Sequence, residues 1–493
     1  MMKQAWVIAF LCAAGIVAHG QKAAPRSGRK PMELELKIGK TQFILKESLR
    51  LEVIVHNRGS GAVSVPAIAD SRNRALSYRL MGSSFPKELV FQYAGPDAMT
   101  IPGGPAMLTV ESGGSVSVPI SIEKYWTDWK PGAHKLRAIL NWGGESIESN
   151  LLLFEILNPE VKSGQVIVDS VSSSSESMRA VFLVSAGGVN RLYQGFFREA
   201  RPGLETRPES NFTEAFEVPA TATSVAALWA DFDRRSAMVS PRYVWLRGHS
   251  AAVQEFQSPP VTFDLGEEKL MRPGVLTRDA DALLVSWNGS HAMLTRVPRK
   301  GAPSKVWDAT LPFSAADGRV WLTPEGKVTV VFAAERSNTV SMFLVQEGQV
   351  IATTEIENAV LLPQSEPGLA IASDGTIRAS VLVAEPEQRR RISTVEWKWK
   401  HGEPGVAPER QRVVDLAQDP RAAAVVYTFS AGVPRRDWVI LYGSEIIVTN
   451  RSPGRPRILD GTPVLPLQLL PRAQTSYLLV KHPREIVYLA PMF

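Results

Sequence analysis

The residues of this sequence whose types and spacing could do chemistry are arginines in short polar segments between predicted strands. A guanidinium group is planar and always charged, and it binds carboxylate, sulfate or phosphate through two hydrogen bonds. If each segment joins the two middle strands of a sheet, the arginines share one face and form a ring of positive charge. Acidic residues in the same segments leave solvated hairpin tips as the alternative interpretation. The predicted ligand-binding residues are Arg234, Arg235, Arg336, Arg389, Arg390, Arg391, Arg435 and Arg436.

Motifs that mark catalysis or metal binding are missing from the sequence. No two histidines have metal-ligand spacing, and neither a His-Glu-x-x-His zinc motif nor a Gly-x-Ser-x-Gly elbow is present. Asp279 and Asp281 lack the further ligands of a calcium loop and are typical of a hairpin tip. Trp397 and Trp399 share one face of a strand, where they either stack on sugar rings or pack against the next sheet. We therefore expect no catalytic residue, no metal and no cofactor.

Residues 1–20 have the pattern of a secretory signal, with a basic residue, an apolar run and small residues in turn. The apolar run is shorter than the roughly 20 residues that a membrane-spanning helix needs. Cleavage is predicted before Gln21, followed by a flexible, basic segment at 21–31. We expect a periplasmic or secreted protein with no stable membrane anchor after cleavage.

Composition narrows the class of protein further. The chain has 493 residues, of which 44% are hydrophobic and 21% charged, so it can form several globular domains of about 150 residues. Its one cysteine, Cys12, lies in the signal, which excludes disulfides, thiolate catalysis and cysteine metal sites from the mature chain. The formal net charge of +6 is small for this length, and no nucleic-acid partner is expected.

Residues 32–157 have the period-two alternation of β-strands. Leu34, Leu36 and Ile38 alternate with charged residues, so their side chains fall on one face. About seven such short runs, separated by turns and without a helical period, predict a β-sandwich. The clearest other runs lie at 49–55, 115–122, 135–140 and 151–156.

Three groups of residues add to this pattern. The stretch from Phe43 to Leu51 reads F-x-x-x-E-x-L-x-L and leads into Val55-His56-Asn57. Trp129-Lys130-Pro131-Gly132 precedes one strand, and Ser149-Asn150 precedes the last. With these groups, the region resembles the immunoglobulin-like domains of exported bacterial proteins. The resemblance implies a structural or adhesive module and no catalytic residue.

Residues 160–493 repeat a pair of apolar strands with a polar turn between them. The repeat of about 45 to 56 residues is typical of four-stranded β-propeller blades, and we expect about seven of them. The last pair ends near Phe493 without an outer strand, so we expect Gln165–Val171 to supply that strand and close the ring. The first strands of the pairs begin near Ala180, Ala226, Ala282, Val328, Ala379, Ala424 and Ser476.

An all-β chain with an N-terminal immunoglobulin-like sandwich, a propeller and no catalytic motif favours a non-enzymatic function. We expect an extracytoplasmic binding or scaffold protein whose partner is an anionic glycan or a protein of the cell envelope. The alternative is a glycan-acting hydrolase or lyase with a site in the propeller funnel, because sequence spacing cannot pair the carboxylates that such a site uses.

Overall fold

The computed structural model describes most of the chain from residue 32 to 492, and every regular element with described bounds is a β-strand. The all-β class predicted from the sequence is therefore confirmed. None of the described residues forms a helix that is long and apolar enough to cross a membrane. The predicted signal and the flexible segment at 21–31 lie outside the described residues. Within 32–492, the residues left out are 68–74, 83–86, 93–106, 123–127, 172–175, 199–211, 220–221, 229–230, 233–234, 237–241, 248–249, 256–257, 266–268, 271–274, 278, 323–326, 431–432, 449–456, 466, 468, 472–475 and 483–485.

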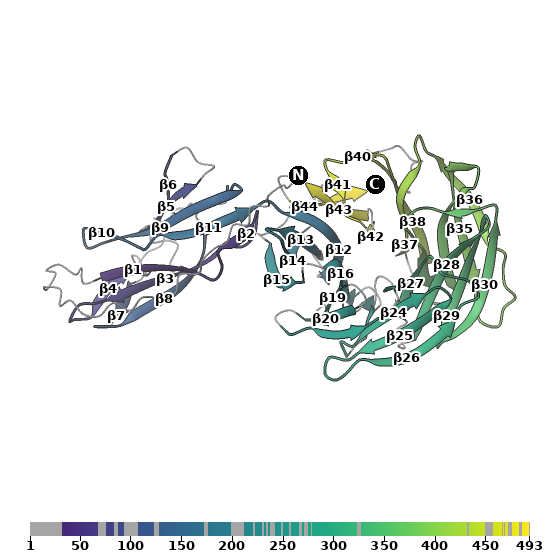
Figure 1. The fold of residues 1–493 in the computed structure, drawn as a ribbon, viewed down its shortest axis with the longest axis horizontal. Coiled ribbons are helices and arrows are strands. Elements are labelled where there is room, and N and C mark those ends of the chain that lie inside the picture. The colour runs from purple at the N-terminus through teal and green to yellow at the C-terminus, as the bar shows by residue number, and fades with distance from the viewer. Residues whose placement is uncertain are drawn as a thin grey trace, which may run out of the picture.

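The N-terminal region forms two main sheets, on one side of the molecule in Figure 1. The first sheet contains β1 (Met32–Ile38), β3 (Arg50–Asn57) and β8 (Ser115–Ser121), in that order. The second contains β2 (Gln42–Ile44), β11 (Leu152–Leu157), β9 (Gly132–Trp142), β5 (Leu76–Gly82) and β6 (Leu89–Gln92), with β10 (Glu145–Glu148) paired to β9. A small two-stranded sheet contains β4 (Val63–Pro66) and β7 (Met107–Val110).

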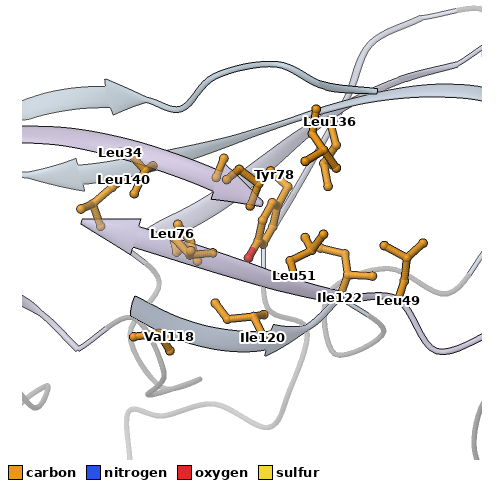
Figure 2. Close-up of a cluster of buried hydrophobic side chains, with 14 of the residues drawn as sticks. Leu34, Leu49, Leu51, Leu76, Tyr78, Val118, Ile120, Ile122, Leu136 and Leu140 are labelled. Carbon is orange, nitrogen blue, oxygen red and sulfur yellow. The ribbon is translucent and has the colours of Figure 1, made fainter. Parts of the chain in front are cut away.

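The two main sheets share one hydrophobic core (Figure 2). Leu34 and Leu51 from the first sheet and Leu76, Tyr78 and Leu136 from the second are all buried in it. The alternation in the sequence explains this packing, because every second side chain of a strand points to the same face. The charged residues between the core positions therefore lie on the outer face.

Seven larger sheets follow in chain order from residue 160. The first two contain β12 (Glu160–Val171), β13 (Glu176–Ala186), β14 (Val189–Arg198) and β15 (Thr213–Val218), then β16 (Ala222–Leu228), β19 (Arg242–Arg247), β20 (Ser250–Gln254) and β21 (Val261–Asp264). The hairpin β17 (Asp231–Phe232) and β18 (Arg235–Ser236) lies between β16 and β19 in the chain. The next two contain β22 (Lys269–Leu270), β23 (Val275–Leu276), β24 (Ala282–Asn288), β25 (His291–Val297) and β26 (Ser304–Thr310), then β27 (Asp317–Leu322), β28 (Val328–Arg336), β29 (Thr339–Gln346) and β30 (Gln349–Glu357).

The last three sheets each contain one or more strands of only two residues. The fifth contains β31 (Val360–Leu361), β33 (Gly368–Ile371), β34 (Ile377–Glu385), β35 (Gln388–Trp399) and β36 (Glu409–Asp415). The sixth contains β32 (Ser365–Glu366), β37 (Pro420–Ser430), β38 (Val433–Tyr442), β39 (Glu445–Val448) and β40 (Arg457–Ile458). The seventh contains β41 (Thr462–Pro463), β42 (Leu469–Pro471), β43 (Ser476–His482) and β44 (Ile486–Met492).

These sheets follow one another around a curve, so that the last lies beside the first (Figure 1). The expectation that Gln165–Val171 completes the last sheet is wrong. That segment is the second half of β12, and Gln165 pairs with Val181 of β13 in an antiparallel register. Among the described strands, none pairs with the outer edge of β44. Side chains join the first and last sheets instead, with Phe182 of the first sheet and Leu479 of the last in one buried cluster.

The N-terminal region is joined to the first of the seven sheets through the segment after β2. Phe212 forms an isolated bridge with Glu47, and its backbone exchanges hydrogen bonds with Lys46 and Ser48. Ile44 is 1% exposed and belongs to the same cluster as Phe182 and Leu479. The packing at this junction is thus continuous with the packing between the first and last of the seven sheets.

A buried polar cluster, which we call the junction cluster, lies beside this contact and contains Lys40, Glu47, Tyr193 and Glu214. The Lys40 ammonium forms ion pairs with both carboxylates, and the Tyr193 hydroxyl donates a hydrogen bond to Glu47 at 3.0 Å. The backbone N–H of Ile44 also donates to Glu47, at 2.9 Å. Burial raises the pKa of the Glu47 carboxyl above its ordinary value, against the opposing effect of Lys40.

Candidate functional site

The structure places the predicted arginines in or beside the turns of several different hairpins. Arg336 ends β28, and Arg389, Arg390 and Arg391 lie at the start of β35, so both groups flank a turn between the second and third strands of a sheet. Arg435 and Arg436 lie in β38, after the turn that follows β37. Arg235 lies in the β17–β18 hairpin, and Arg234 lies outside the described residues.

Strand directions show that these turns do not share one face. Residues 360–371 run antiparallel to β34, since Val360 pairs with Ala384 and Ile371 with Ile377. Within that stretch, β32 pairs in parallel with β37, so β37 runs antiparallel to β34. The turns that follow β34 and β37 therefore lie at opposite ends of their sheets, and the expected ring of arginines is wrong.

Arg336 lies at the same end of the sheets as Arg389. The backbone N–H of Ala359 donates to Asn338 in the turn beside Arg336, at 2.8 Å. Residue 360 then pairs with Ala384, next to the turn that carries Arg389. Arg435 and Arg436 lie at the other end, where Arg436 donates to Gln411 near the start of β36.

The turn after β34 opens on a surface hollow of about 580 Å³, which we call the arginine hollow. Its wall is made of the turn, the start of β35, the end of β36 and the segment that leads into β37. Apart from one proline, every lining side chain is charged or an amide. The lining residues are Pro386, Glu387, Gln388, Arg389, Arg390, Arg391, Asp415 and Asp419.

Ion pairs use most of the charges in the arginine hollow. Arg390 contacts Asp419 at 3.0 Å, and Arg391 contacts Glu385 behind the turn at 3.2 Å. Asp415 forms an ion pair with Arg412 on its own strand. Arg389 and Glu387, both exposed, have no charged or hydrogen-bonding partner among the described residues. The hollow thus offers one unengaged guanidinium and one unengaged carboxylate.

The remaining predicted arginines with described side chains also have neighbours. Arg435 lies 3.6 Å from the Asp437 carboxylate, and the Arg336 guanidinium lies over the Phe313 ring at 5.7 Å from its centroid. The Asp437 carboxylate therefore offsets the charge of Arg435, whereas Arg336 keeps its charge and packs on an aromatic ring.

A second polar cluster, which sequence reasoning missed, lies between the fifth and sixth sheets. The Tyr427 hydroxyl donates to Glu396 at 3.1 Å and contacts the Ser380 hydroxyl at 2.5 Å. Arg378 and Lys398 lie 3.8 and 3.5 Å from the Glu396 carboxylate. Burial, and then the Glu396 charge, raise the pKa of the Tyr427 phenol far above its ordinary value, so it stays protonated. A single tyrosine in the apolar run of β37 was the only signal of this cluster in the sequence.

Two alternatives left open by the sequence are also answered. Trp397 is 3% exposed and packs in the core between the fourth and fifth sheets, so it does not face a sugar. The Asp281 carboxylate binds the Arg296 guanidinium and the backbone N–H of Arg299, so these partners lie outside its own turn, unlike the local backbone bonding expected of a hairpin tip. Within the part of the chain that the structure describes, no three histidine or acidic side chains gather as metal ligands would.

Comparisons with known proteins give no family. No family model matches the sequence, and no curated protein matches it. Among solved structures, an α-L-arabinanase of Penicillium chrysogenum has 9% identity and a TM-score of 0.28, over 68% of this chain and 98% of that one. The NanB sialidase of Streptococcus pneumoniae has 10% identity and a TM-score of 0.29, over 80% of both chains. An ACO/RPE65 chimera has 10% identity and a TM-score of 0.34, over 90% of this chain and 91% of that one.

These comparisons correct the expectation of a non-enzymatic binding or scaffold protein. Besides the arabinanase and the sialidase, the similar structures include a mannose phosphorylase and a polysaccharide lyase. Every TM-score among them is below 0.5, so no residue role or mechanism is transferred from them to this chain. The site must be argued from the chain's own residues.

Proposed function

We propose that the chain is a glycan-acting hydrolase or lyase whose substrate binds in the arginine hollow. One observation carries the proposal, namely a hollow of about 580 Å³ whose lining side chains, apart from Pro386, all end in a carboxylate, guanidinium or amide group. Its volume falls in the range of small-molecule sites, which are usually mostly apolar. A wall of hydrogen-bonding groups instead suits a ligand with many hydroxyl groups, and its guanidinium groups suit an acidic sugar.

The charged groups of the hollow have separate roles in this proposal. Arg389 holds the carboxylate or sulfate of an acidic sugar, because no described side chain engages its guanidinium. Glu387 meets the substrate for the same reason, while Asp415 across the hollow supplies a second carboxylate. Glycoside hydrolysis generally uses two carboxyl groups, one to protonate the leaving oxygen and one to activate water or attack the sugar.

The test is incubation of the purified chain with a panel of neutral and acidic polysaccharides. Hydrolysis releases reducing ends alone, whereas a lyase also creates an unsaturated product that absorbs ultraviolet light. We expect cleavage of an acidic polysaccharide, lost in Glu387→Gln and weakened in Arg389→Ser through a higher KM. Glu355→Gln is the matched control, because Glu355 is an exposed carboxylate on nearby β30 without a described partner. Cleavage that is unchanged in Glu387→Gln, or absent on the whole panel, contradicts the proposal.

We propose further that residues 32–157 form an immunoglobulin-like sandwich and residues 160–493 a seven-bladed β-propeller. Two sheets over one core support the first assignment, and seven successive sheets support the second. We also propose export to the periplasm or the medium, where the substrate is a glycan of the cell envelope or its surroundings. Mass spectrometry of exported protein is expected to find Gln21 at the N-terminus, and an intact Met1 would contradict export with cleavage.

A further inference from the structure

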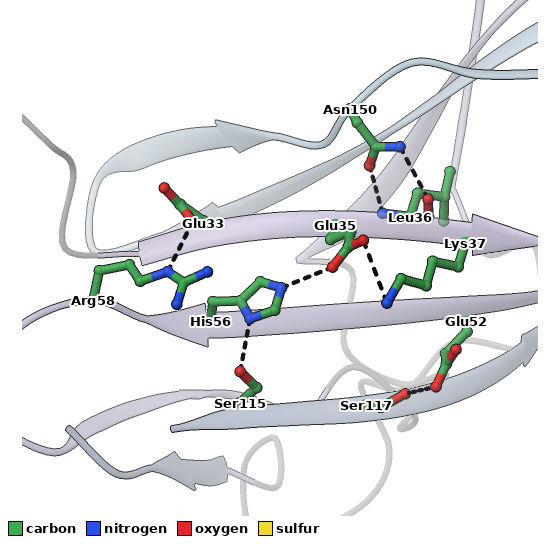
Figure 3. Close-up of polar contacts among 10 residues, drawn as sticks. All are labelled: Glu33, Glu35, Leu36, Lys37, Glu52, His56, Arg58, Ser115, Ser117 and Asn150. Carbon is green, nitrogen blue, oxygen red and sulfur yellow. Dashed lines mark hydrogen bonds and ion pairs between the residues drawn. The ribbon is translucent and has the colours of Figure 1, made fainter. Parts of the chain in front are cut away.

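Three side chains on the outer face of the first N-terminal sheet form a serine–histidine–glutamate relay (Figure 3). The Ser115 Oγ lies 2.7 Å from the His56 Nδ1, and the His56 Nε2 lies 3.0 Å from a Glu35 carboxylate oxygen. Each residue comes from a different strand, β8, β3 and β1 respectively. A hydroxyl in hydrogen-bond contact with a base, which a third group orients, is the arrangement that activates nucleophilic serines.

The register of the sheet explains why the serine and the histidine meet. Asn57 and Gly114 are joined by a backbone hydrogen bond of 3.0 Å, so the next pair along, His56 and Ser115, is not hydrogen-bonded through the backbone. Side chains in such pairs are closer than in hydrogen-bonded pairs. Glu35 lies diagonally across from His56 on the other neighbouring strand, within reach of the far ring nitrogen.

The charges around the relay favour the productive tautomer. When the Nε2–H of His56 donates to Glu35, Nδ1 is left to accept the proton of Ser115. The hydrogen bond from His56, together with Lys37 at 3.4 Å, holds the pKa of the Glu35 carboxyl below its usual range, so the acceptor stays ionised. Arg58 does not compete, because its Nε donates to Glu33 at 2.9 Å.

The position of Ser115 on β8 also supplies a donor for a developing oxyanion. Among the described strands, β8 ends its sheet, with β3 on its only paired side. Because Ser115 and His56 are not bonded through the backbone, the Ser115 N–H points away from β3, toward the open edge of β8. A backbone N–H of the nucleophile itself is one of the donors that stabilise tetrahedral intermediates.

We propose that Ser115 is a nucleophile toward carboxylic esters of small acyl groups, a second activity separate from the proposed glycan cleavage. The Ser115 Oγ attacks the carbonyl carbon while its proton moves to the His56 Nδ1. The ester C–O bond then breaks, and His56 returns that proton to the leaving alkoxide. Water, deprotonated by His56, hydrolyses the acyl-serine and restores the hydroxyl. Ser115 is exposed on the outer face of the sheet, so an ester with a small acyl group can reach its Oγ without a preformed acyl pocket.

A neighbouring serine provides a matched control. Ser117 lies two residues along β8, on the same face and also exposed, but its hydroxyl contacts the Glu52 carboxylate instead of a histidine. The two serines therefore share strand, face and exposure and differ in the base. A reagent that reacts with any exposed hydroxyl labels both, whereas one that needs an activated oxygen labels Ser115 alone.

The experiment treats the full chain with a fluorophosphonate probe and separately measures its hydrolysis of p-nitrophenyl acetate. Peptide mass spectrometry is expected to find the label on Ser115, lost in Ser115→Ala and retained in Ser117→Ala. Ester hydrolysis should fall to background in Ser115→Ala and at least about 100-fold in His56→Gln, the effect typical of a lost general base. Glu35→Ala is expected to lower the rate and Glu35→Asp to restore part of it, at an unchanged thermal midpoint, which identifies Glu35 as a positioning residue.

Some outcomes would overturn the proposal. No labelling of Ser115, labelling of Ser117 to the same extent, or hydrolysis that survives in Ser115→Ala each contradicts it. If His56→Gln fails to fold, the two serine variants still decide the question, because they change only exposed hydroxyl groups. None of these results depends on glycan cleavage, so the two proposals fail separately.

Discussion

The junction cluster and the arginine hollow contain the same kinds of charge in opposite surroundings. In the junction cluster, the Glu47 side chain is 3% exposed and is engaged by Lys40, Tyr193 and the backbone of Ile44. In the hollow, the side chains of Arg390 and Asp419 pair at 3.0 Å while 60% and 64% exposed. Water screens the second pair and is largely kept from the first. The number of charges in a cluster therefore says little about how much the cluster contributes to the free energy of unfolding, because that contribution depends on burial.

The largest expected effect comes from removing the buried carboxylate. Glu47→Ala leaves the Tyr193 hydroxyl and the Ile44 N–H without an acceptor, and it takes one of two carboxylates from Lys40. We expect a loss of about 2 to 3 kcal/mol in the free energy of unfolding, less than for a fully buried pair because Lys40 is partly exposed. Urea denaturation measures it, with the exposed Glu217→Ala on β15 as the control. If Glu47→Ala loses no more unfolding free energy than the control, burial does not determine how much the cluster contributes to stability.

A smaller effect is expected from pH. Because the pKa of Glu47 is raised in the folded state, the stability that it contributes is full below the ordinary value of 4.5 and is lost as the pH rises through the folded pKa. Glu47→Gln cannot titrate at this position, so the stability of the wild type relative to this variant should fall as the pH rises above 4.5. Denaturation curves of both proteins on either side of that pH provide the measurement. A relative stability that rises instead means that Lys40 outweighs burial.

The smallest effect is expected in the hollow. Arg390→Ala removes an ion pair that is exposed on both sides, so the free energy of unfolding should change by no more than about 0.5 kcal/mol. This change in the free energy of unfolding should also differ little between low and high salt. Thermal and urea denaturation at low and high salt test both statements. A loss comparable to that of Glu47→Ala would remove the distinction between the two clusters.

Sequence reasoning found the strands better than their positions within the sheets. The long apolar strands such as β28, β34 and β37 were recognised, because alternation and turn residues mark them. β37 is the second strand of its sheet, as β34 is, but it runs in the opposite direction. The pair that shows this joins β37 to β32, which is only Ser365–Glu366 and carries no recognisable pattern. The turn at Arg435 therefore lies at the opposite end from the turn at Arg389, and the sequence did not contain that direction.

The functional residues show the same limit. Arg389, Arg390 and Arg391 were predicted, with five other arginines, because they lie at a turn between two paired strands, and the hollow does open beside that turn. The relay of Glu35, His56 and Ser115 was not recognised, because its residues come from three strands far apart in the sequence. Only the register of those strands brings them together, and a single sequence does not contain it.

The packing of Ile44 has a consequence for truncation. This side chain precedes residue 160, yet it is buried in the cluster that joins the first and last of the seven sheets. A fragment beginning at residue 160 would keep every strand of those sheets. It would lose Ile44, which covers the apolar contact between the first and last sheets. The apolar side chains at that contact would then be exposed to water, and such patches promote self-association. The C-terminal fragment is therefore expected to aggregate when made alone, although every strand pair within its seven sheets would be kept.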